Sequence, residues 1–165
     1  LASSAGRLFD AFSASLGLAQ EQVTYEGQAA IRLEAAAWRE PGGDIRPFPW
    51  SSRFDGELLR IDWAPLWRDD PARHASPARD FHHALAEAAL AMLDHAAGVA
   101  GGDAAELPVL LTGGVMQNRY LTSLLAEKLG RRCLLPRLIP PNDGGIAVGQ
   151  IFGDGWNLDG KTDKR

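Results

Sequence analysis

The stretch "LLTGGVMQNRYL" (Leu110–Leu121) leads from an apolar segment through two successive glycines into a pattern typical of a helix. A second glycine pair stands in "PPNDGGIAVG" (Pro140–Gly149), again between an apolar segment and a helical pattern. A strand that ends in Gly-Gly and enters a helix leaves backbone N–H groups free to bind an anion. Because ligands of α/β proteins collect at the ends of strands, the two turns predict a shared crevice for a nucleotide. Tight turns without a ligand are the alternative.

The segments around the two turns alternate between strand and helix. The pattern predicts strands at Val109–Leu111 and Arg132–Leu135, and helices at Asn118–Leu129 and Gly144–Phe152. This order predicts an α/β fold in which helices flank a mixed sheet. The helix between the two strands is expected to bury Leu121, Leu124, Leu125 and Leu129.

The region before these turns predicts helices and one hairpin. A first helix is expected to be capped by Ser3 or Ser4 and to end at Gly17, and a second is expected at Gln28–Trp38. Prolines and alternating apolar residues predict an extended hairpin within Arg46–Trp63.

A long Ala-rich helix is predicted from Ser76 to Ala97, where glycines end the pattern. Residues spaced by three or four should form its buried face: Phe81, Leu85, Ala88, Met92 and Ala96.

Length and composition limit the classes of function. A chain of 165 residues with 45% hydrophobic residues fits one domain, or one lobe of a larger one. The net charge of −4 argues against nucleic acid as a partner. No apolar run is long enough to span a membrane, and the first residues lack the layout of a signal peptide. We therefore expect a cytoplasmic protein whose chain was cut within a longer one, with a frayed polar tail at residues 154–165.

Asp143 lies between two prolines and the second glycine pair, where a helix should start. As an N-cap it would accept hydrogen bonds from the first N–H groups of the helix. As a carboxylate directed at the crevice it would suit a divalent metal. The two interpretations are compatible with each other.

The histidines form no recognisable metal motif. His82 and His83 are adjacent, so their side chains diverge by about 100° on a helix and cannot chelate one ion together. His83 and Glu87 have suitable spacing but are expected to be a partly exposed pair on the helix face. We expect His74 and His95 at the surface.

The single cysteine and the tryptophans suggest structural roles. Cys133 lies in an apolar strand with no histidine nearby in sequence, so we expect a buried, inert thiol and no disulfide. Trp50, Trp63 and Trp67 predict packing in the core or hairpin, with partner docking as the alternative.

Four blocks in order closely resemble the C-terminal end of the HypF family, the carbamoyltransferases of hydrogenase maturation. The blocks are "SSAGRLFDAFSASLGL", "TYEGQAAIRLE", "LTGGVMQNRYL" and "PPNDGGIAVGQ". Gln28 stands where the related tRNA-modifying enzymes have a second glycine, which favours HypF. The resemblance implies that residues 1–153 form the second lobe of an actin-like, sugar-kinase-like nucleotide-binding domain.

The resemblance also implies the reaction. Carbamoyl phosphate and ATP form carbamoyl-adenylate in a separate upstream domain, and the actin-like domain passes the carbamoyl group to the C-terminal cysteine of the partner HypE. Dehydration there gives the cyanide ligand of nickel–iron hydrogenase. Three alternatives share the fold: an O-carbamoyltransferase, a tRNA threonylcarbamoyl-type transferase, and a nucleotide-binding lobe that is inactive without its first half.

Site residues follow from the resemblance position by position. Asp10 matches an acid that binds the nucleotide ribose, and Glu26 and Gly27 match a loop of the same pocket. The adenosine-binding turn is matched by Gly113, Gly114 and Asn118.

Asp143 matches a metal-ligating carboxylate of the family. Its two histidine partners belong to the family's first lobe, and their motif is absent from this chain. The implied metal is divalent, Fe or Zn, with Mg as a further candidate. We therefore expect the isolated chain to bind metal weakly and to be inactive.

Overall fold

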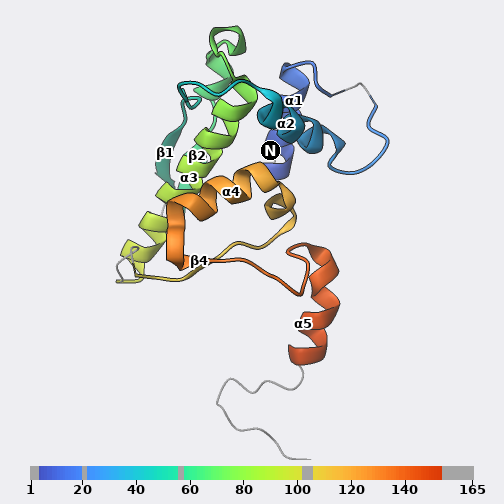
Figure 1. Cartoon of the computed structure of the whole chain (residues 1–165). Helices are drawn as coiled ribbons and strands as arrows, with labels where there is room; N and C mark the ends of the chain where they lie inside the picture. The colour runs from blue at the N-terminus through green and yellow to red at the C-terminus, as the bar shows by residue number, and fades with distance from the viewer. Residues whose placement is uncertain (1–3, 20–21, 56–57, 102–105, 154–165) are drawn as a thin grey trace, which may run out of the picture.

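The computed structural model describes residues 4–19, 22–55, 58–101 and 106–153 (Figure 1). Its helices and small sheets confirm the predicted α/β class, and each predicted helix and strand is present near its expected bounds. No helix in these described ranges is long and apolar enough to cross a membrane. The expected cap at Ser3 and the expected tail at residues 154–165 lie outside the described residues.

Three helices form the first part of the core: α1 (Ala5–Ser15), α2 (Gln28–Arg39) and α3 (Pro77–Val99). Their apolar faces meet in an aromatic cluster. The Phe12 ring stacks on the Phe81 ring at a centroid distance of 4.4 Å, and Phe9 meets Phe81 edge-on at 5.2 Å. Figure 1 shows α1 and α2 side by side next to the beginning of α3. Burial of such rings is a large favourable term for a domain of this size.

The predicted buried face of α3 is correct only for its first half. Phe81, Leu85 and Ala88 are buried, whereas Met92 is 47% exposed and Ala96 is exposed as well. The aromatic cluster of α1 and α3 covers the beginning of α3, and the periodicity of a sequence does not reveal how far a packing partner extends.

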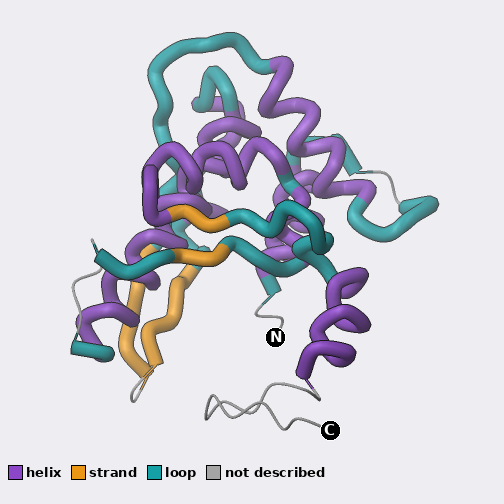
Figure 2. Tube along the Cα trace, turned by 60° about the horizontal axis from the view of Figure 1, so that its bottom comes forward, coloured by secondary structure: helices purple, strands orange, loops and turns teal. Residues whose placement is uncertain are grey.

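The predicted hairpin consists of β1 (Ser51–Asp55) and β2 (Leu58–Asp62), which are antiparallel with Ser51 opposite Asp62. It packs beside α3 (Figure 2). Its Phe54 ring contacts the ring of His95 on α3 edge-on at a centroid distance of 5.1 Å, so His95 is half-buried.

The last part of the chain is a strand–helix–strand unit followed by a helix. β3 (Val109–Leu110) and β4 (Cys133–Leu134) pair in parallel, and α4 (Arg119–Leu129) connects them. Three of the four leucines expected to be buried on α4 are buried, while Leu124 is half-buried. α5 (Ile146–Gly153) lies apart from the first three helices (Figure 1).

The strands form two separate pairs among the described residues, one antiparallel and one parallel, instead of one continuous sheet (Figure 2). Short 3-10 helices complete the connections, and such single turns carry no periodicity in the sequence. Their bounds are η1 (Leu66–Arg68), η2 (Pro71–Arg73), η3 (Gly114–Gln117), η4 (Gly130–Arg132) and η5 (Asp143–Gly145).

Candidate functional site

The two glycine turns are neighbours in space. β3 and β4 run in parallel, with Leu111 N–H donating to the Leu134 carbonyl at 3.0 Å, so their carboxyl ends lie together. Beyond these ends, the Gly113 N–H donates to the carbonyl oxygen of Pro141 at 2.5 Å. The Thr112 hydroxyl donates to the same oxygen at 3.2 Å. The structure therefore brings the turn that carries Gly113 beside the turn that carries Asp143.

Two of the four glycines are required by the backbone. Gly113 has φ of 99°, in the region that side chains disfavour. At Gly145 a Cβ atom would lie 2.8 Å from the Pro140 carbonyl oxygen and 2.9 Å from the Cγ2 atom of Ile139. Gly114 differs, because a Cβ atom there would meet no heavy atom within 4 Å. The open space at Gly114 leaves room for a ligand to approach the backbone.

Most N–H groups of the two turns already have acceptors. Gly113 donates to Pro141, Gly144 donates to the Asn142 side chain at 3.1 Å, and Gly145 donates to the Asn142 carbonyl at 2.9 Å. Among the described residues, the N–H of Gly114 has no protein acceptor. The expected pair of free amides at the first turn is therefore reduced to one.

The cap of the second turn is Asn142, not Asp143, which corrects one of the two interpretations of the sequence. The Asn142 side chain accepts from the Gly144 N–H, and Asp143 is the first residue of η5. Asn142 is in the extended conformation that an N-cap requires, which places the helix start one residue earlier than the sequence suggested. The Asp143 side chain is exposed, and no described residue pairs with its carboxylate.

The described residues do not form a complete metal site around Asp143. No three His, Cys, Asp or Glu side chains within the described ranges gather closely enough to hold one ion. A single carboxylate is a poor site for a divalent metal. Asp143 can therefore supply one ligand at most.

Asn118, at the end of the first turn, is buried, and its side chain makes two hydrogen bonds. Its side-chain oxygen accepts from the Leu121 N–H at 2.8 Å, which caps α4. Its side-chain nitrogen lies 3.0 Å from Nε2 of His82 on α3. The Arg119 N–H donates to Glu34 on α2 at 2.8 Å, so two helices hold the start of α4. Sequence reasoning did not assign His82 or Glu34 to the site, because contacts between distant helices leave no local pattern.

His82 is uncharged in this environment. Its side chain is completely buried, and burial lowers its pKa from 6.5 to about 4. The ring Nδ1 lies 2.6 Å from the carbonyl oxygen of Ala78. Burial also lowers the pKa of the neighbouring His83, which is half-buried with Glu87 as expected.

The residues assigned to the ribose side of the pocket lie on α1 and at the start of α2. Asp10 is about one-third exposed (38%), and Arg7 donates a hydrogen bond to it at 3.1 Å. Glu26 is exposed, and Gly27 has φ of 77° as the residue before α2. No described hydrogen bond joins these residues to the glycine turns.

His74 is buried, which corrects the expectation of a surface position. Its Nδ1 lies 2.7 Å from Asp80 on α3, and its Nε2 lies 3.2 Å from Asp69. The Phe48 ring stacks on the imidazole at 3.8 Å. The loop that carries His74 folds back onto α3, so a polar residue from a polar segment enters the core with partners on both ring nitrogens. The hydrogen bond from His74 is the main cause that lowers the pKa of Asp69.

Cys133 is half-buried, so the expectation of a buried thiol is met only in part. Burial raises the pKa of the Cys133 thiol, which makes it a weaker nucleophile near neutral pH. Trp50 and Trp63 pack against the core, whereas Trp67 is 47% exposed. The Trp67 ring nevertheless lies at a centroid distance of 6.3 Å from the ring of the core residue Phe12, so all three tryptophans contact the core.

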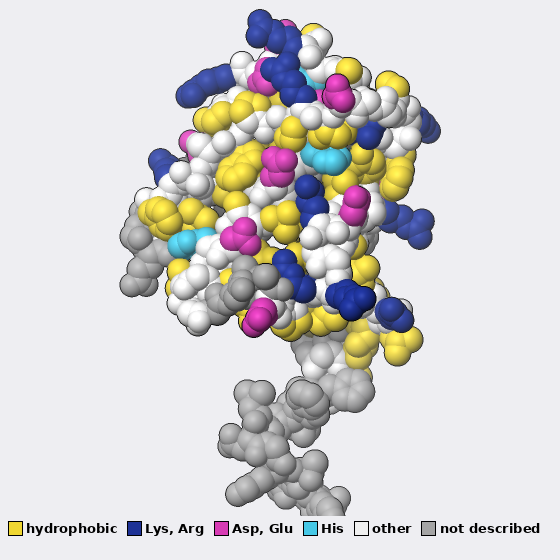
Figure 3. All heavy atoms as spheres, turned by 60° about the vertical axis from the view of Figure 1, so that its left-hand side comes forward, with side chains coloured by type: hydrophobic (Ala, Val, Ile, Leu, Met, Phe, Trp, Pro, Cys, Tyr) yellow, Lys and Arg dark blue, Asp and Glu magenta, His cyan; other side chains and the backbone are white. Residues whose placement is uncertain are grey.

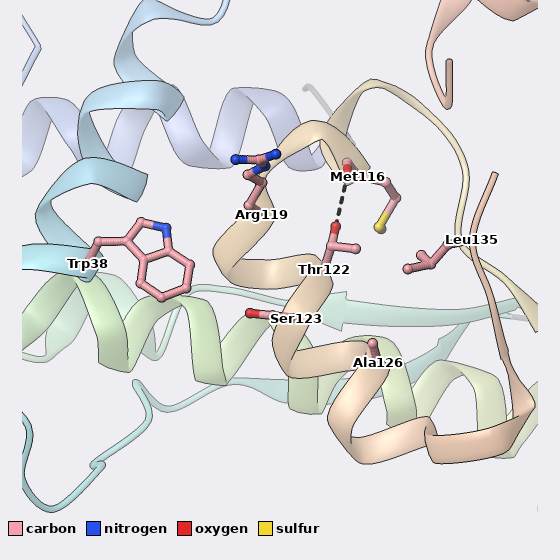
Figure 4. A pocket seen from close by; sticks show the side chains of 7 residues that line it. All are labelled: Trp38, Met116, Arg119, Thr122, Ser123, Ala126 and Leu135. Atoms are coloured by element: carbon pink, nitrogen blue, oxygen red, sulfur yellow. Dashed lines mark hydrogen bonds between the residues drawn. The ribbon is translucent and has the colours of Figure 1, made fainter. Parts of the chain in front are cut away.

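A pocket of about 380 Å³ lies along the outer side of α4 (Figure 4). Its lining residues are Trp38, Met116, Arg119, Thr122, Ser123, Ala126 and Leu135. The hydroxyl groups of Thr122 and Ser123 already donate to backbone carbonyls at 2.9 Å each. Arg119 is the one charged residue of the lining. The pocket includes Met116 of the first turn but none of the residues assigned to nucleotide or metal.

One face of the surface carries charges of both signs. Figure 3 shows Lys and Arg interspersed with Asp and Glu, and no continuous basic area on that face. Duplex nucleic acid binds mainly through clusters of positive charge. This face therefore offers no support for a nucleic-acid interface.

Comparisons with known proteins agree with this architecture. Residues 1–150 match the family model described as "Carbamoyltransferase, Kae1-like Domain, second subdomain". The chain is 37% identical to the carbamoyltransferase HypF of Synechocystis and 40% identical to that of Rhodobacter capsulatus. Each alignment covers 92% of this chain but only 19% of the relative, so the chain spans about a fifth of their length.

A solved structure has the same fold. The chain is similar to the crystal structure of full-length HypF in the phosphate- and nucleotide-bound form, with a TM-score of 0.75 and 30% sequence identity. The similarity covers 90% of this chain and 23% of that one. The match to a HypF structure agrees with the actin-like lobe that the family resemblance implied.

Proposed function

The chain belongs to the HypF family of carbamoyltransferases, and on this basis we propose that it forms the nucleotide-holding side of a carbamoyl-transfer site. In this proposal the donor is carbamoyl-adenylate, made from carbamoyl phosphate and ATP elsewhere in the full gene product. The acceptor is the C-terminal cysteine of a HypE-type partner, as required for cyanide-ligand synthesis in nickel–iron hydrogenase.

The transfer is a substitution at the carbamoyl carbon. The cysteine thiol of the partner first loses its proton to solvent. The thiolate sulfur then forms a bond to the carbamoyl carbon while the bond from that carbon to the AMP oxygen breaks. AMP leaves with the electron pair of that bond. Cys133 takes no part, because its raised pKa keeps the thiol protonated near neutral pH.

One observation carries the proposal: the 2.5 Å hydrogen bond between the Gly113 N–H and the Pro141 carbonyl. It joins the turn assigned to adenosine with the turn that carries Asp143. Gly114 faces open space and keeps its N–H without an acceptor among the described residues. A nucleotide on the first turn would therefore lie close to an exposed carboxylate on the second.

Asp10, Glu26 and Gly27 complete the proposed pocket on the ribose side. Asp10 and its partner Arg7 are both partly exposed, and such an ion pair contributes little stability. The carboxylate of Asp10 can therefore exchange Arg7 for a ribose hydroxyl at small cost.

The described residues form no group of three metal-ligating side chains, so Asp143 is an incomplete metal site within this chain. We propose that the remaining ligands come from outside this chain, and that Asp143 contributes one oxygen to an Fe, Zn or Mg ion. No step of the transfer above depends on that ion. The isolated chain is accordingly proposed to bind AMP without turning over carbamoyl phosphate.

The experiment is a transfer assay with the full gene product, carbamoyl phosphate, ATP and a HypE-type partner. We expect a mass increase of one carbamoyl group on the partner's C-terminal cysteine, and AMP affinity that falls when Asp10 is changed to Ala. Glu87→Ala is the control for a charge lost from another half-buried acidic residue. Transfer to a small-molecule hydroxyl or to tRNA, with none to the cysteine, would contradict the proposed acceptor.

A further inference from the structure

We infer that His82 is a positioning residue for the nucleotide turn: it fixes the side chain of Asn118 and so sets where η3 ends and α4 begins. The inference rests on the proposed function, since it concerns how the turn of Gly113 to Asn118 is held ready for the nucleotide. The structural basis for the inference is a buried chain of hydrogen bonds that runs from α3 to the first turn of α4.

The hydrogen bonds determine the tautomer of His82. The Leu121 N–H can only donate, so the Asn118 group at 2.8 Å from it must be the oxygen. The Asn118 nitrogen is therefore the atom that faces Nε2 of His82 at 3.0 Å. A side-chain amide nitrogen can only donate, so Nε2 must accept and carry no proton. The proton resides on Nδ1, which donates to the carbonyl oxygen of Ala78 at 2.6 Å.

The imidazole cannot turn away from this arrangement. It is completely buried and is surrounded by three aromatic rings from three helices. Phe9 of α1 lies at a centroid distance of 5.3 Å, Phe81 of α3 at 5.8 Å, and Tyr120 of α4 at 5.0 Å, all edge-on. Rotation of the ring would displace side chains in a close-packed core.

The same ring connects the two regions assigned to the nucleotide. Phe9 directly precedes Asp10 on α1, and Tyr120 follows Asn118 at the start of α4. Contact of one imidazole with both rings couples the position of the ribose-binding acid to that of the glycine turn. A change at His82 should therefore affect ligand binding without any contact between His82 and the ligand.

The two hydrogen bonds of Asn118 also fix the orientation of its amide. Its oxygen caps α4 and one of its two amide N–H groups donates to His82, so the amide is held in a single orientation. Asn118 then acts by fixing the backbone of η3, where the Gly114 N–H is available. Without an acceptor at position 82, the buried amide nitrogen of Asn118 would lose its partner and the amide would reorient.

The test compares two variants of His82 in the full gene product. His82→Phe keeps a ring but removes the acceptor, whereas His82→Gln keeps an acceptor oxygen without the ring. Leu85→Ala is the matched control, because Leu85 is also buried on α3 but is none of the rings around His82 and makes no hydrogen bond to Asn118. The readouts are the AMP dissociation constant and the separate kcat and KM values for carbamoyl-adenylate, the donor that this lobe is proposed to bind, in the transfer assay.

We expect His82→Phe to raise the AMP dissociation constant and the KM about tenfold, the effect of one unpaired buried amide. The AMP dissociation constant and the KM of His82→Gln should stay close to those of the wild-type protein. Leu85→Ala should lower thermal stability and the active fraction, and so the apparent kcat, while KM stays unchanged. That split between KM and kcat separates positioning from general destabilisation.

Asn118→Ser supplies the second line of the test if His82→Phe does not fold. Serine keeps an N-cap oxygen for α4 but has no amide N–H for His82, so KM should again rise. AMP binding by His82→Phe or Asn118→Ser equal to that of the unchanged protein would overturn the inference and leave the proposed function intact. Absence of AMP binding by the unchanged protein would instead overturn the proposed function, and the positioning role with it.

Discussion

The backbone N–H of Gly113 lies 2.5 Å from the carbonyl oxygen of Pro141, so one hydrogen bond joins two turns that are far apart in the sequence. Gly113 adopts φ of 99° in this turn, a conformation that side chains disfavour. The hydrogen bond also occupies an amide that the sequence suggested was free for a ligand. The glycine at this position therefore serves the contact between the turns, and its neighbour Gly114 is the one that faces open space.

Gly113→Ala should destabilise the protein by about 1–3 kcal/mol, because an alanine must adopt a strained positive φ. Gly114→Ala is the matched control and should change the free energy of unfolding by less than about 0.5 kcal/mol, since its Cβ meets nothing. Chemical unfolding of the three proteins measures both effects. Equal losses of unfolding free energy at the two positions would contradict the conclusion that the backbone requires glycine at Gly113 but not at Gly114.

Gly145→Ala and Gly149→Ala should act in opposite directions. A methyl group at Gly145 would collide with the Pro140 carbonyl at 2.8 Å, so the turn must shift and the thermal midpoint should fall. At Gly149, inside α5, the methyl group has open space, and alanine favours a helix by about 1 kcal/mol. A thermal midpoint unchanged by Gly145→Ala would show that the backbone there is less restricted than described.

His82 should make stability fall as the pH is lowered from 6.5 towards 4. The folded protein holds the ring neutral with a pKa of about 4, whereas the unfolded chain protonates it below its ordinary pKa of 6.5. The unfolded state therefore binds more protons in this window, and stability changes by up to about 1.4 kcal/mol per pH unit. The free energy of unfolding, measured at several pH values, should depend less on pH in His82→Gln. A slope identical to that of the unchanged protein would refute this prediction.

Loss of His74 should be among the most destabilising changes. His74→Leu leaves the buried Asp80 carboxylate without one of its donors, at a cost of about 3–5 kcal/mol for a broken buried pair. His74→Leu combined with Asp80→Asn should recover part of the loss, because the unpaired charge is gone. His95→Leu is the control at a half-buried position of α3, and it should lower the free energy of unfolding by less than about 1 kcal/mol. Thermal and chemical unfolding distinguish these variants.

Asp143→Ala and Asn142→Ala should separate metal binding from helix capping. Asp143 is exposed and no described residue pairs with it, so its loss should lower the metal content of the full gene product without changing stability. Asn142 caps η5, so its loss should cost about 0.5–2 kcal/mol and leave the metal content unchanged. Elemental analysis and unfolding give the two readouts. Unchanged metal in Asp143→Ala would remove Asp143 from the ligand set.

Much of the fold was predictable because its signals are local. The helices at Gln28–Arg39, Pro77–Val99 and Arg119–Leu129 follow from apolar residues spaced by three or four and from the glycines or prolines near their ends. Met92 and Leu124 were assigned to the core by the same periodicity, but they are not fully buried. Periodicity identifies the face of a helix, whereas burial also depends on how far its partner extends.

The candidate site was only partly predictable. The position of two glycine turns at the ends of neighbouring strands follows from the order of elements, and the structure brings the turns together. The roles of Asp10, Glu26, Gly27, Asn118 and Asp143 as ligand-binding residues remain predictions. Asn142 rather than Asp143 as the cap could not be foreseen, since both residue types cap helices well and the backbone angles decide between them.

The sequence alone determined the helices, the strands, the two glycine turns and the family resemblance, because each is encoded by residues close together in the chain. Tertiary structure alone decided that His82 holds Asn118, that Glu34 binds the start of α4, and that His74 is buried between two carboxylates. The physical reason is that these contacts join residues far apart or on different elements. A polar side chain finds such a partner only once packing has placed both groups out of water.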